Sequence, residues 1–416
     1  MEHPLRLLGL PPGHGQGTAG AGADFRPLPV ACVFGTRPEA IKMAPVVSEL
    51  QRHPELFRCQ VVVTAQHRQM LDQVLDLFQI RPDVDLDIMQ PGQGLSDVVV
   101  RALPGLERAF RQLRPALVLV HGDTTTAFVA ALAAFYQQIP VGHVEAGLRS
   151  HDRYQPFPEE INRRLISVLA DLHFAPTAVA RRTLEQENQD PRRIFVTGNT
   201  VIDALLRVVQ MPVQWRQARL KSLPPLGKDG RTLADGRRLV LVTAHRRENH
   251  GLPLRRICRS LKALASRHPD LLIVYPVHPS PQVRQPVYEE LAGIPAIWLL
   301  EPVEYEEMAH LMARSYLLLT DSGGLQEEGP ALHRPVLVMR EVTERPEGLQ
   351  AGTLRLVGTD PERIQAEVER LLEDPAAYEA MARAANPYGD GRAAQRIIQS
   401  VCYAFGLAGQ RPADFS

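Results

Sequence analysis

The sequence has few cysteines and no long apolar run. Its four cysteines, among 416 residues, lie far apart and form no CxxC motif. This spacing argues against a zinc site or a disulfide framework and fits a reducing compartment. No apolar stretch approaches the roughly 18 to 20 residues that span a bilayer. We therefore expect a soluble, cytoplasmic protein without a membrane partner and without a bound metal.

The chain also lacks an excess of either charge. It has 47 basic and 47 acidic residues, so its formal net charge is zero. Nothing in this balance suggests a broad surface for nucleic acid or for an anionic membrane, so any anion site must be local. We expect no nucleic-acid partner. The length favours two domains, each large enough to bury its own core.

Residues 1–29 contain a formal dinucleotide-binding motif but no pattern of strand or helix around it. Residues 15–20 (GQGTAG) match GxGxxG. No strand pattern precedes them and no helix pattern follows before Pro27 and Pro29, whereas the motif holds phosphates only at a strand-to-helix turn. The apolar stretch at residues 5–10 is too short for a secretory signal. We interpret residues 1–29 as a flexible tail.

From residue 30 onward, short apolar runs alternate with segments of helical spacing. Repeated strand-then-helix units predict a parallel sheet covered by helices on both faces. We expect a first Rossmann-like domain over residues 30–209. Its expected strands are VACVF (30–34), QVVVT (60–64), ALVLV (116–120), VGHV (141–144), LHFA (172–175) and IFVT (194–197).

Residues 210–237 break this rhythm with prolines, glycines and charges, and we interpret them as a linker. A second Rossmann-like domain is expected over residues 238–390, and residues 391–416 would form a helix that crosses back to the first domain. The fold class is α/β, with two doubly wound domains and a central cleft. The second set of expected strands is LVLVT (239–243), LLIVYP (271–276), AIWLL (296–300), YLLLT (316–320), VLVM (336–339) and LRLVG (354–358).

The junction at residues 321–324 predicts a diphosphate site. An apolar strand ends at Asp321, and Ser322, Gly323 and Gly324 lead directly into a helix. Backbone N–H groups at a helix N-terminus are unpaired and carry the positive end of the helix dipole, and glycines let an anion approach them. The next strand leads into residues 344–347 (ERPE), so charged residues follow both strands. In open α/β sheets, ligands bind at this edge.

Two cations follow the first expected strand. Arg37 lies on the turn of FGTRPEAIK, and Lys42 lies about one helical turn further. A guanidinium at the carboxyl end of a strand can hold a phosphate through two hydrogen bonds. Lys42 taken alone is better explained as part of a solvated helix face.

Three acids follow two consecutive strands of the first domain. Asp123 lies in HGDTTT, where it fits a functional carboxylate and a helix N-cap equally well. Glu145 lies in HVEAGLRS, and Glu159 lies in PFPEEINRR, four residues before Arg163. A structural ion pair at this spacing would explain Glu159 and Arg163 on their own. Delivery of three acids to one sheet edge favours a catalytic group.

Histidines follow two strands of the second domain. His245 begins the segment HRREN, and His278 lies in YPVHPSP at the neighbouring strand end. Histidine has an unperturbed pKa near neutrality, which suits proton transfer beside a diphosphate. A lone histidine is usually structural, but one among arginines at a strand end favours function.

In chain order, these motifs resemble the non-hydrolysing bacterial UDP-N-acetylglucosamine 2-epimerases. The resemblance runs from about residue 30 to the last helix, and the set of motifs is far more specific than any one of them. The segments that carry it are FGTRPEAIKMAPV, TAQHRQML, GDTTT, HVEAGLRS, PFPEEINRR, VTGNTVID, VTAHRREN, YPVH, TDSGGLQEE and MREVTERPE.

The resemblance implies a GT-B-like fold, no cofactor, and interconversion of UDP-GlcNAc and UDP-ManNAc for cell-surface polysaccharide. In the family, UDP leaves C1 as C2 loses its proton, and UDP then adds back to the bound 2-acetamidoglucal. The resemblance also implies a homodimer in the cytoplasm. By the same resemblance, the acid/base residues are Asp123, Glu145, Glu159 and His245, and the residues that bind the substrate are Arg37, Lys42, Arg163, Met308, Ser322, Gly323, Gly324, Glu328 and Arg345.

Two departures from the family pattern concern binding. Met308 stands where relatives often have a phenylalanine under the uracil, although core packing also explains a methionine on a helix. Some relatives bind a second UDP-GlcNAc as an activator, whereas Gly92 replaces an arginine of the strongly regulated ones, so activation would be weak or absent. The matching allosteric set here is Gln66, Gln69, Glu159, Arg246 and His278.

Three other functions remain open at this point. A hydrolysing epimerase would release free ManNAc and UDP. A GT-B glycosyltransferase would need an acceptor site, commonly with an apolar or basic patch that we do not find in the sequence. A nucleotide-sugar sensor would keep the phosphate site but could lose the carboxylates, whereas all three acids are present.

Overall fold

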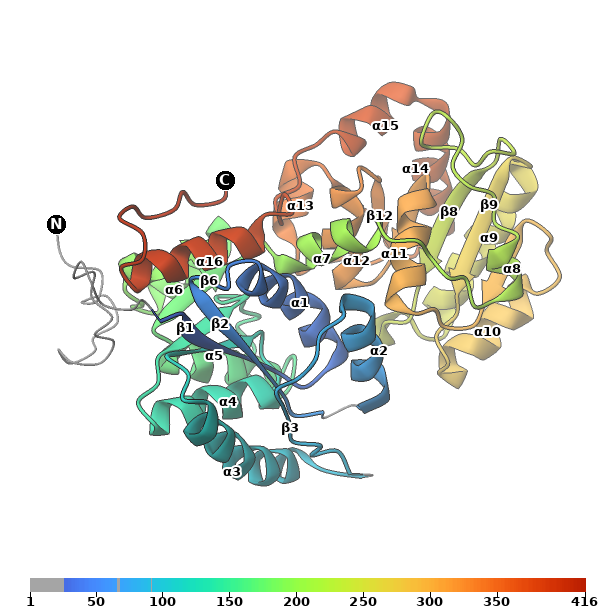
Figure 1. Cartoon of the computed structure of the whole chain (residues 1–416). Coiled ribbons are helices and arrows are strands. Elements are labelled where there is room, and N and C mark those ends of the chain that lie inside the picture. The colour runs from blue at the N-terminus through green and yellow to red at the C-terminus, as the bar shows by residue number, and fades with distance from the viewer. Residues whose placement is uncertain (1–25, 66–67, 91) are drawn as a thin grey trace. The chain divides into compact units, whose positions relative to one another are not determined.

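The computed structural model describes residues 26–65, 68–90 and 92–416, with the backbone alone for residues 68 and 69. The glycine motif of the expected tail and Gln66 lie outside the described residues, as does the side chain of Gln69. The chain divides into two compact units (Figure 1). The first runs to Ala204 and is completed by Gly389–Ser416, and the second is Leu205–Tyr388.

The first unit contains a seven-stranded sheet in the order β3-β2-β1-β4-β5-β6-β7. Every pair of neighbouring strands is parallel. Residues 30–34 are fully buried, as expected for strands covered on both faces. The strands are β1 (Leu28–Phe34), β2 (Phe57–Val63), β3 (Val84–Asp85), β4 (Leu117–His121), β5 (Val141–Val144), β6 (Leu172–Ala175) and β7 (Ile194–Val196).

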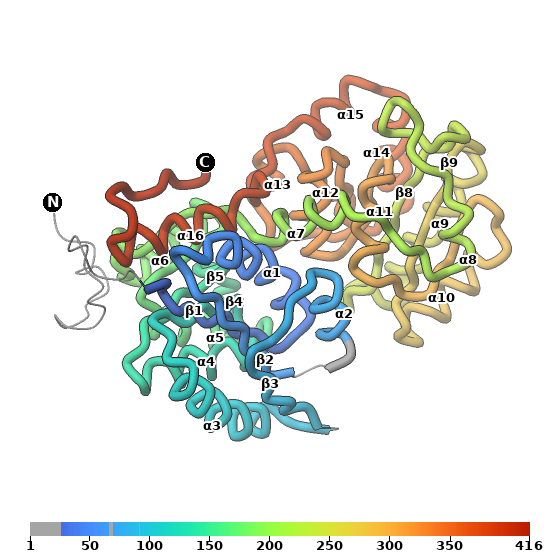
Figure 2. The backbone as a smooth tube through the Cα atoms, in the orientation of Figure 1, coloured from blue at the N-terminus to red at the C-terminus, as the bar shows by residue number. Residues whose placement is uncertain are grey.

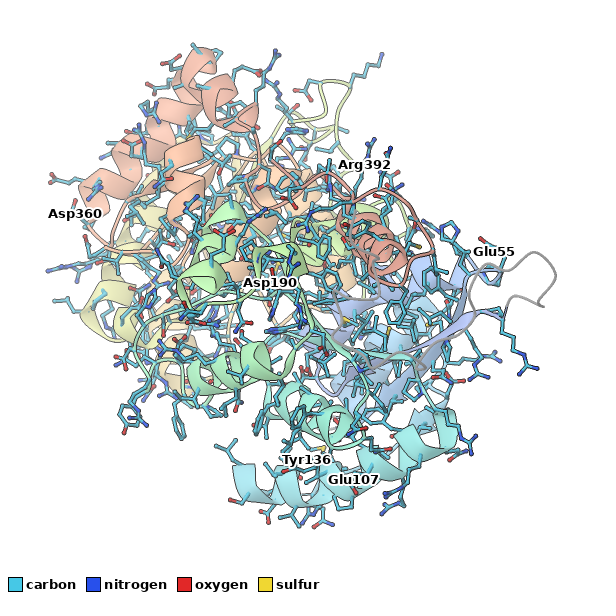
Figure 3. The ribbon with its side chains drawn as sticks, turned by 90° about the vertical axis from the view of Figure 1, so that its left-hand side faces the viewer. Glu55, Glu107, Tyr136, Asp190, Asp360 and Arg392 are labelled. Carbon is cyan, nitrogen blue, oxygen red and sulfur yellow. The ribbon has the colours of Figure 1, made fainter. Side chains whose placement is uncertain are left out.

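Helices cover both faces of this sheet. Helix α1 packs against α2 and α16, and α4 packs against α3 and α5 (Figure 2). Figure 3 shows Glu107 of α3 beside Tyr136 of α4, and Gln137 donates to the Glu107 carbonyl at 3.1 Å. The helices are α1 (Arg37–Gln51), α2 (Arg68–Phe78), α3 (Leu95–Leu113), α4 (Thr125–Tyr136), α5 (Glu159–Leu169), α6 (Ala178–Gln186), the 3₁₀ turn Pro191–Arg193, α7 (Thr200–Val208) and α16 (Ala393–Ala404).

The second unit contains a six-stranded parallel sheet in the order β10-β9-β8-β11-β12-β13. Helix α9 packs against α10 and α14. The elements are α8 (Ala218–Lys221), β8 (Arg238–Thr243), the 3₁₀ turn Arg247–Asn249, α9 (Leu252–Arg267), β9 (Leu271–Pro276), α10 (Pro281–Leu291), β10 (Ile297–Leu300), α11 (Tyr305–Arg314), β11 (Leu317–Thr320), α12 (Gly323–Ala331), β12 (Val336–Val338), α13 (Pro346–Ala351), β13 (Leu354–Leu356), α14 (Pro361–Glu373) and α15 (Pro375–Ala382).

Each sheet has one point where the strand order reverses. In the first unit it lies between β1 and β4, and in the second it lies between β8 and β11. Ligands of doubly wound sheets bind outside the carboxyl ends of the strands at such points. The loops that leave these four strands begin at Gly35, Gly122, Ala244 and Asp321, and they carry Arg37, Asp123, His245 and the 321–324 junction.

The expected strands are all present, with ends that differ by up to three residues, and β3 is an additional two-residue strand. The expected linker contains helix α8 and a bridge between Leu226 and Leu233. Within the described part of the chain, no helix combines the length and the apolar character that crossing a membrane requires.

The last helix, α16, packs on α1 in the first unit. The side chain that caps its first turn comes from α7. The Asp203 carboxylate accepts hydrogen bonds from the backbone N–H groups of Ala393 and Ala394, at 3.2 and 2.9 Å. These are N–H groups in the first turn of α16, which has no side-chain cap of its own. Asp203 therefore ties the returning chain to α7.

We expect Asp203→Ala to lower the free energy of unfolding by about 1 to 2 kcal/mol, because two helix N–H groups lose their acceptor. Asp203→Asn keeps one acceptor oxygen and should cost less. Urea unfolding of both variants measures the difference. Equal stability of Asp203→Ala and the unchanged protein would contradict this role.

Candidate active site

The loop after β1 is held by a buried carboxylate. Glu39 accepts hydrogen bonds from the backbone N–H of Gly35 and of Thr36, at 3.1 and 2.8 Å, and from the Thr36 hydroxyl at 2.8 Å. Its other oxygen accepts from the Thr124 hydroxyl at 2.6 Å. Burial raises the pKa of Glu39. A Cβ on Gly35 would lie 2.0 Å from Thr64 Oγ1, so this turn requires glycine. Glu39 thus joins the loops after β1 and β4.

Glu145 and Lys42 form a half-buried ion pair at the same sheet edge. Asn199 Nδ2 also donates to Glu145 Oε1, at 2.9 Å, and His121 Nε2 lies 3.5 Å from Oε2. Glu145 has a φ of +64°, in the left-handed region that non-glycine residues rarely adopt. The interpretation of Lys42 as part of a solvated face is therefore wrong. Arg37 begins α1 nearby and is half-buried.

Asp123 pairs with Arg163 at 2.7 Å. The N-cap of α4 is Thr124, whose hydroxyl accepts from the Ala127 N–H at 3.0 Å, so the N-cap interpretation of Asp123 is wrong. Burial raises the pKa of Asp123 to about 6, Arg163 opposes this rise, and the charge of Glu145 adds to it. A carboxylate with this pKa can accept and return a proton near neutral pH.

Glu159 completes the carboxylate cluster of Asp123, Glu145 and Glu159. Its charge also raises the pKa of Asp123, so the structure brings the three predicted acids together. The Arg163 guanidinium reaches Asp123, and toward Glu159 its Nε contacts only the backbone carbonyl, at 3.4 Å. The alternative explanation of Glu159 and Arg163 as a structural ion pair is therefore wrong. Within the described residues, Glu159 Oε2 is buried without a hydrogen-bond partner.

In the second unit, fully buried Asp321 organises the loop after β8. Its Oδ2 accepts from the backbone N–H of His245 and of Arg246, each at 2.8 Å, and from Asn249 Nδ2 at 3.0 Å. Its Oδ1 lies 3.5 Å from His245 Nδ1. Asp321, which follows the strand before the expected diphosphate site, therefore also holds the backbone that carries His245.

His245 stacks on His278, with ring centroids 5.5 Å apart and planes at 14°. Burial lowers the pKa of His245, Asp321 opposes the shift, and His278 contributes to it. His245 is therefore mainly uncharged near neutral pH and can accept a proton.

The start of α12 has the features of an anion site. Its N-cap is Ser322, which makes no side-chain cap, and its first residue is Gly323. A Cβ on Gly323 would lie 3.5 Å from Arg246 Nη2 and 4.0 Å from Arg345 Nη2, so two guanidinium groups flank the first turn. Gly324 follows and is exposed. Free helix N–H groups and two arginines together suit a diphosphate.

Glu328 lies one turn further along α12 and is buried. It accepts a hydrogen bond from the Tyr305 hydroxyl at 3.1 Å. Burial and the charge of Glu328 raise the pKa of Tyr305. Met308, one turn along α11 from Tyr305, is half-buried.

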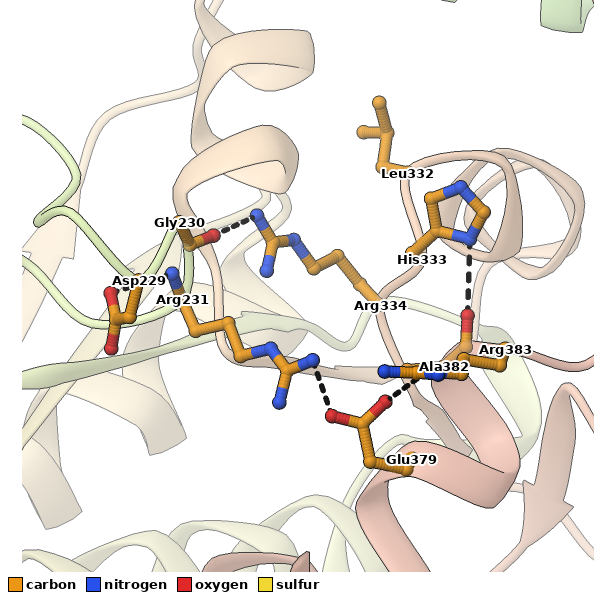
Figure 4. Close-up of a pocket in the computed structure, with 9 residues that line it drawn as sticks. All are labelled: Asp229, Gly230, Arg231, Leu332, His333, Arg334, Glu379, Ala382 and Arg383. Atoms are coloured by element: carbon orange, nitrogen blue, oxygen red, sulfur yellow. Dashed lines mark hydrogen bonds and ion pairs between the residues drawn. The ribbon is translucent and has the colours of Figure 1, made fainter.

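A surface pocket of about 390 Å³ elsewhere in the second unit contains none of the predicted residues (Figure 4). Glu379 pairs there with Arg231 and Arg383, and Arg334 donates to the backbone carbonyl of Gly230. We assign it no part in the candidate site.

Sequence reasoning missed several residues of these clusters. Glu39 contacts the loop that carries Asp123, and His121 and Asn199 approach Glu145. Asp321 was expected only to end the strand before the diphosphate site, whereas it also holds the loop that carries His245. HGDTTT and VTGNTVID contain two of them, so a search of each motif for polar side chains at strand ends could have found His121 and Asn199. Glu39 follows Thr36 at the spacing of a capping box, so its contact with Thr36 could also have been predicted from the sequence.

Comparison with known proteins identifies the family. A family model described as UDP-N-acetylglucosamine 2-epimerase matches residues 48–402. The chain belongs to the UDP-N-acetylglucosamine 2-epimerase family. The expected resemblance and the expectation of an isomerase are thereby confirmed.

Individual members of the family are similar over most of their length. UDP-N-acetylglucosamine 2-epimerase of Escherichia coli K12 is 53% identical over 377 residues, which cover 90% of this chain and 98% of that one. A Listeria monocytogenes structure assigned to the same activity has a TM-score of 0.86 at 46% identity, covering 94% and 100%. A Neisseria meningitidis epimerase structure bound to UDP-GlcNAc has a TM-score of 0.78 at 46% identity, covering 90% and 99%. The expected GT-B-like α/β fold is confirmed.

The contact between Asp321 and His245 makes a prediction that needs no substrate. We expect Asp321→Asn to lower the pKa of His245 further, because the carboxylate charge favours the imidazolium form. An NMR titration of the His245 ring, assigned with His245→Gln, measures it. His278→Gln should shift the pKa of His245 in the opposite direction. An unchanged or higher pKa in Asp321→Asn would contradict the geometry.

Proposed function

We propose that this epimerase-family protein interconverts UDP-GlcNAc and UDP-ManNAc without net hydrolysis. The observation that carries the proposal is the carboxylate cluster of Asp123, Glu145 and Glu159 at the carboxyl edge of the first sheet. A protein that only senses or binds a nucleotide sugar does not need three crowded carboxylates, one of them with a pKa of about 6. The identity to the Escherichia coli enzyme supports the same substrate.

The chemistry requires elimination and re-addition. The hydrogen on C2 of the sugar is not next to a carbonyl group, so its direct removal as a proton is unfavourable. When the C1–O bond to UDP breaks as C2 loses its proton, the products are UDP and 2-acetamidoglucal. Addition of UDP to C1, with a proton delivered to the opposite face of C2, gives the epimer. No atom is gained or lost overall.

The first unit supplies the proton-transfer groups in this proposal. Asp123, with a pKa of about 6, can exist in either protonation state near neutral pH. Glu145 is kept in place by Lys42 and Asn199, and Arg163 holds Asp123. Arg37, half-buried at the start of α1, would contact the phosphates, as Lys42 would in the family pattern. Several positioned carboxylates allow one to remove the proton and another to return it.

The second unit supplies the groups for UDP. The Ser322 hydroxyl, the N–H groups at Gly323 and Gly324 and the guanidinium groups of Arg246 and Arg345 would stabilise the departing diphosphate. Glu328 would accept hydrogen bonds from the ribose hydroxyls, and Met308 would contact the uracil. His245, mainly uncharged, would take up a proton beside the phosphates.

Further parts of the proposal rest on likeness to the family. We propose a cytoplasmic homodimer, and the four unpaired cysteines are consistent with a reducing compartment. UDP-ManNAc is an activated sugar, which suits a supply of ManNAc for cell-surface polysaccharide. Any activating UDP-GlcNAc would bind weakly. Of the residues that match the allosteric set, Arg246 flanks Gly323 and would contact a diphosphate.

Incubation of the protein with UDP-GlcNAc in deuterium oxide tests the proposal. We expect deuterium at C2 in a mixture of gluco and manno nucleotide sugars, because the eliminated proton exchanges before it returns. Proton and phosphorus NMR follow both products. Free ManNAc and UDP as the main products would indicate a hydrolysing epimerase, and absence of C2 exchange would overturn the proposal.

Substitutions in the two units should separate turnover from UDP binding. We expect Glu145→Gln to lower kcat by about 100- to 10,000-fold with little change in UDP affinity. Arg345→Ala should weaken UDP binding by about 10- to 100-fold. The exposed Arg383, which pairs with Glu379, provides an arginine control, and its alanine variant should change neither. Calorimetry with UDP and initial rates measure both effects. Normal turnover of Glu145→Gln would contradict its role.

A further inference from the structure

A buried histidine that the proposed chemistry does not use lies beside Glu145. His121 is 3% exposed, and among the described residues neither of its ring nitrogens has a hydrogen-bond partner. Burial of unpaired polar atoms costs free energy, so such atoms in a folded protein call for an explanation. The nearest polar group that could provide one is the Glu145 carboxylate, whose Oε2 lies 3.5 Å from His121 Nε2.

The backbone around His121 holds the two side chains in register. His121 ends β4 and pairs with Val144 of β5, one residue before Glu145. The Gly122 N–H donates to the Val144 carbonyl at 2.9 Å, and the Gly122 carbonyl lies 2.7 Å from His143 Nε2. The left-handed φ of Glu145 then turns its side chain at this point. The approach of His121 to Glu145 is therefore built into the ends of two paired strands.

We propose that His121 is a positioning residue for Glu145, which it steadies through an Nε2–H directed at Oε2. Lys42 and Asn199 both donate to Oε1, so a donor at Oε2 would fix the rotation of the carboxylate. Burial lowers the pKa of His121 to about 4, with Glu145 opposing and Lys42 adding to the shift. The ring is therefore an uncharged donor at neutral pH. This inference rests on the proposed catalytic role of Glu145.

Two amide substitutions separate the two ring nitrogens. A glutamine at position 121 places its amide nitrogen near the position of Nε2, whereas an asparagine reaches only the position of Nδ1. We expect His121→Asn and His121→Leu to lower kcat by about 100-fold, because a misplaced catalytic group costs about this much. His121→Gln should stay within about fivefold of the unchanged protein. UDP affinity should change little, because His121 is not among the groups proposed to bind UDP.

His173 offers a matched control. It is fully buried in β6, where it lies opposite His143 of β5. His173→Leu should lower thermal stability as His121→Leu does but should leave kcat within about threefold. Two results would contradict the proposal: an equal loss of kcat in all three position-121 variants, or a loss in His173→Leu as large as in His121→Leu. Either result would show that kcat depends on the presence of a buried histidine and not on the Nε2–H of His121.

A measurement on the unchanged protein does not depend on whether the variants fold. We expect nitrogen-15 NMR of His121 to show protonated Nε2 and unprotonated Nδ1 from pH 5.5 to 9. The charged groups that act on the His121 ring are Glu145 and Lys42, and His143 is a further titratable group that interacts with it. Protonation of Nδ1 instead would overturn the proposal. Normal kcat in His121→Leu would also overturn it, whereas absence of C2 exchange in the unchanged protein would reject the proposed function itself.

Discussion

Buried carboxylates, each held by a small set of donors, determine where the functional side chains of this protein lie. Asp321 accepts three hydrogen bonds from the loop after β8, and Glu39 accepts four from the loops after β1 and β4. Loss of one of these donors would reduce the hydrogen bonding that compensates a buried carboxylate, which is unfavourable. The loops therefore have little freedom to move away from the ends of their strands.

The two parallel sheets place these carboxylates where ligands bind. Each sheet reverses its strand order once, and the loops at that point, with those after the neighbouring strands β5 and β9, carry the polar motifs. In the first unit, three carboxylates lie close to Lys42 and Arg163. In the second unit, two arginines flank the N-terminus of α12. The first arrangement favours proton transfer, and the second favours an anionic leaving group.

Much of this arrangement could be predicted from the sequence because parallel strands buried on both faces are short apolar runs. Strand β3 could not, because two residues carry no periodic signal. The role of Asp123 as a helix cap was undecided because Thr124 competes for the same cap, and only the folded loop shows which residue takes it. The contact of Arg163 with Asp123 could not be predicted, because the sequence shows only the local spacing of four residues to Glu159 and not a contact with a distant loop.

Burial raises the pKa of Asp123 into the physiological range, and the nearby charges of Glu145 and Glu159 add to this shift, whereas Arg163 opposes it. A carbon-13 NMR titration of the Asp123 carboxyl group, assigned with Asp123→Asn, tests this claim directly in the protein without substrate. We expect a midpoint near pH 6 in the unchanged protein and a lower midpoint in Glu145→Gln, where one neighbouring negative charge is absent. A midpoint near 3.9, the value of an unperturbed aspartate, would contradict it.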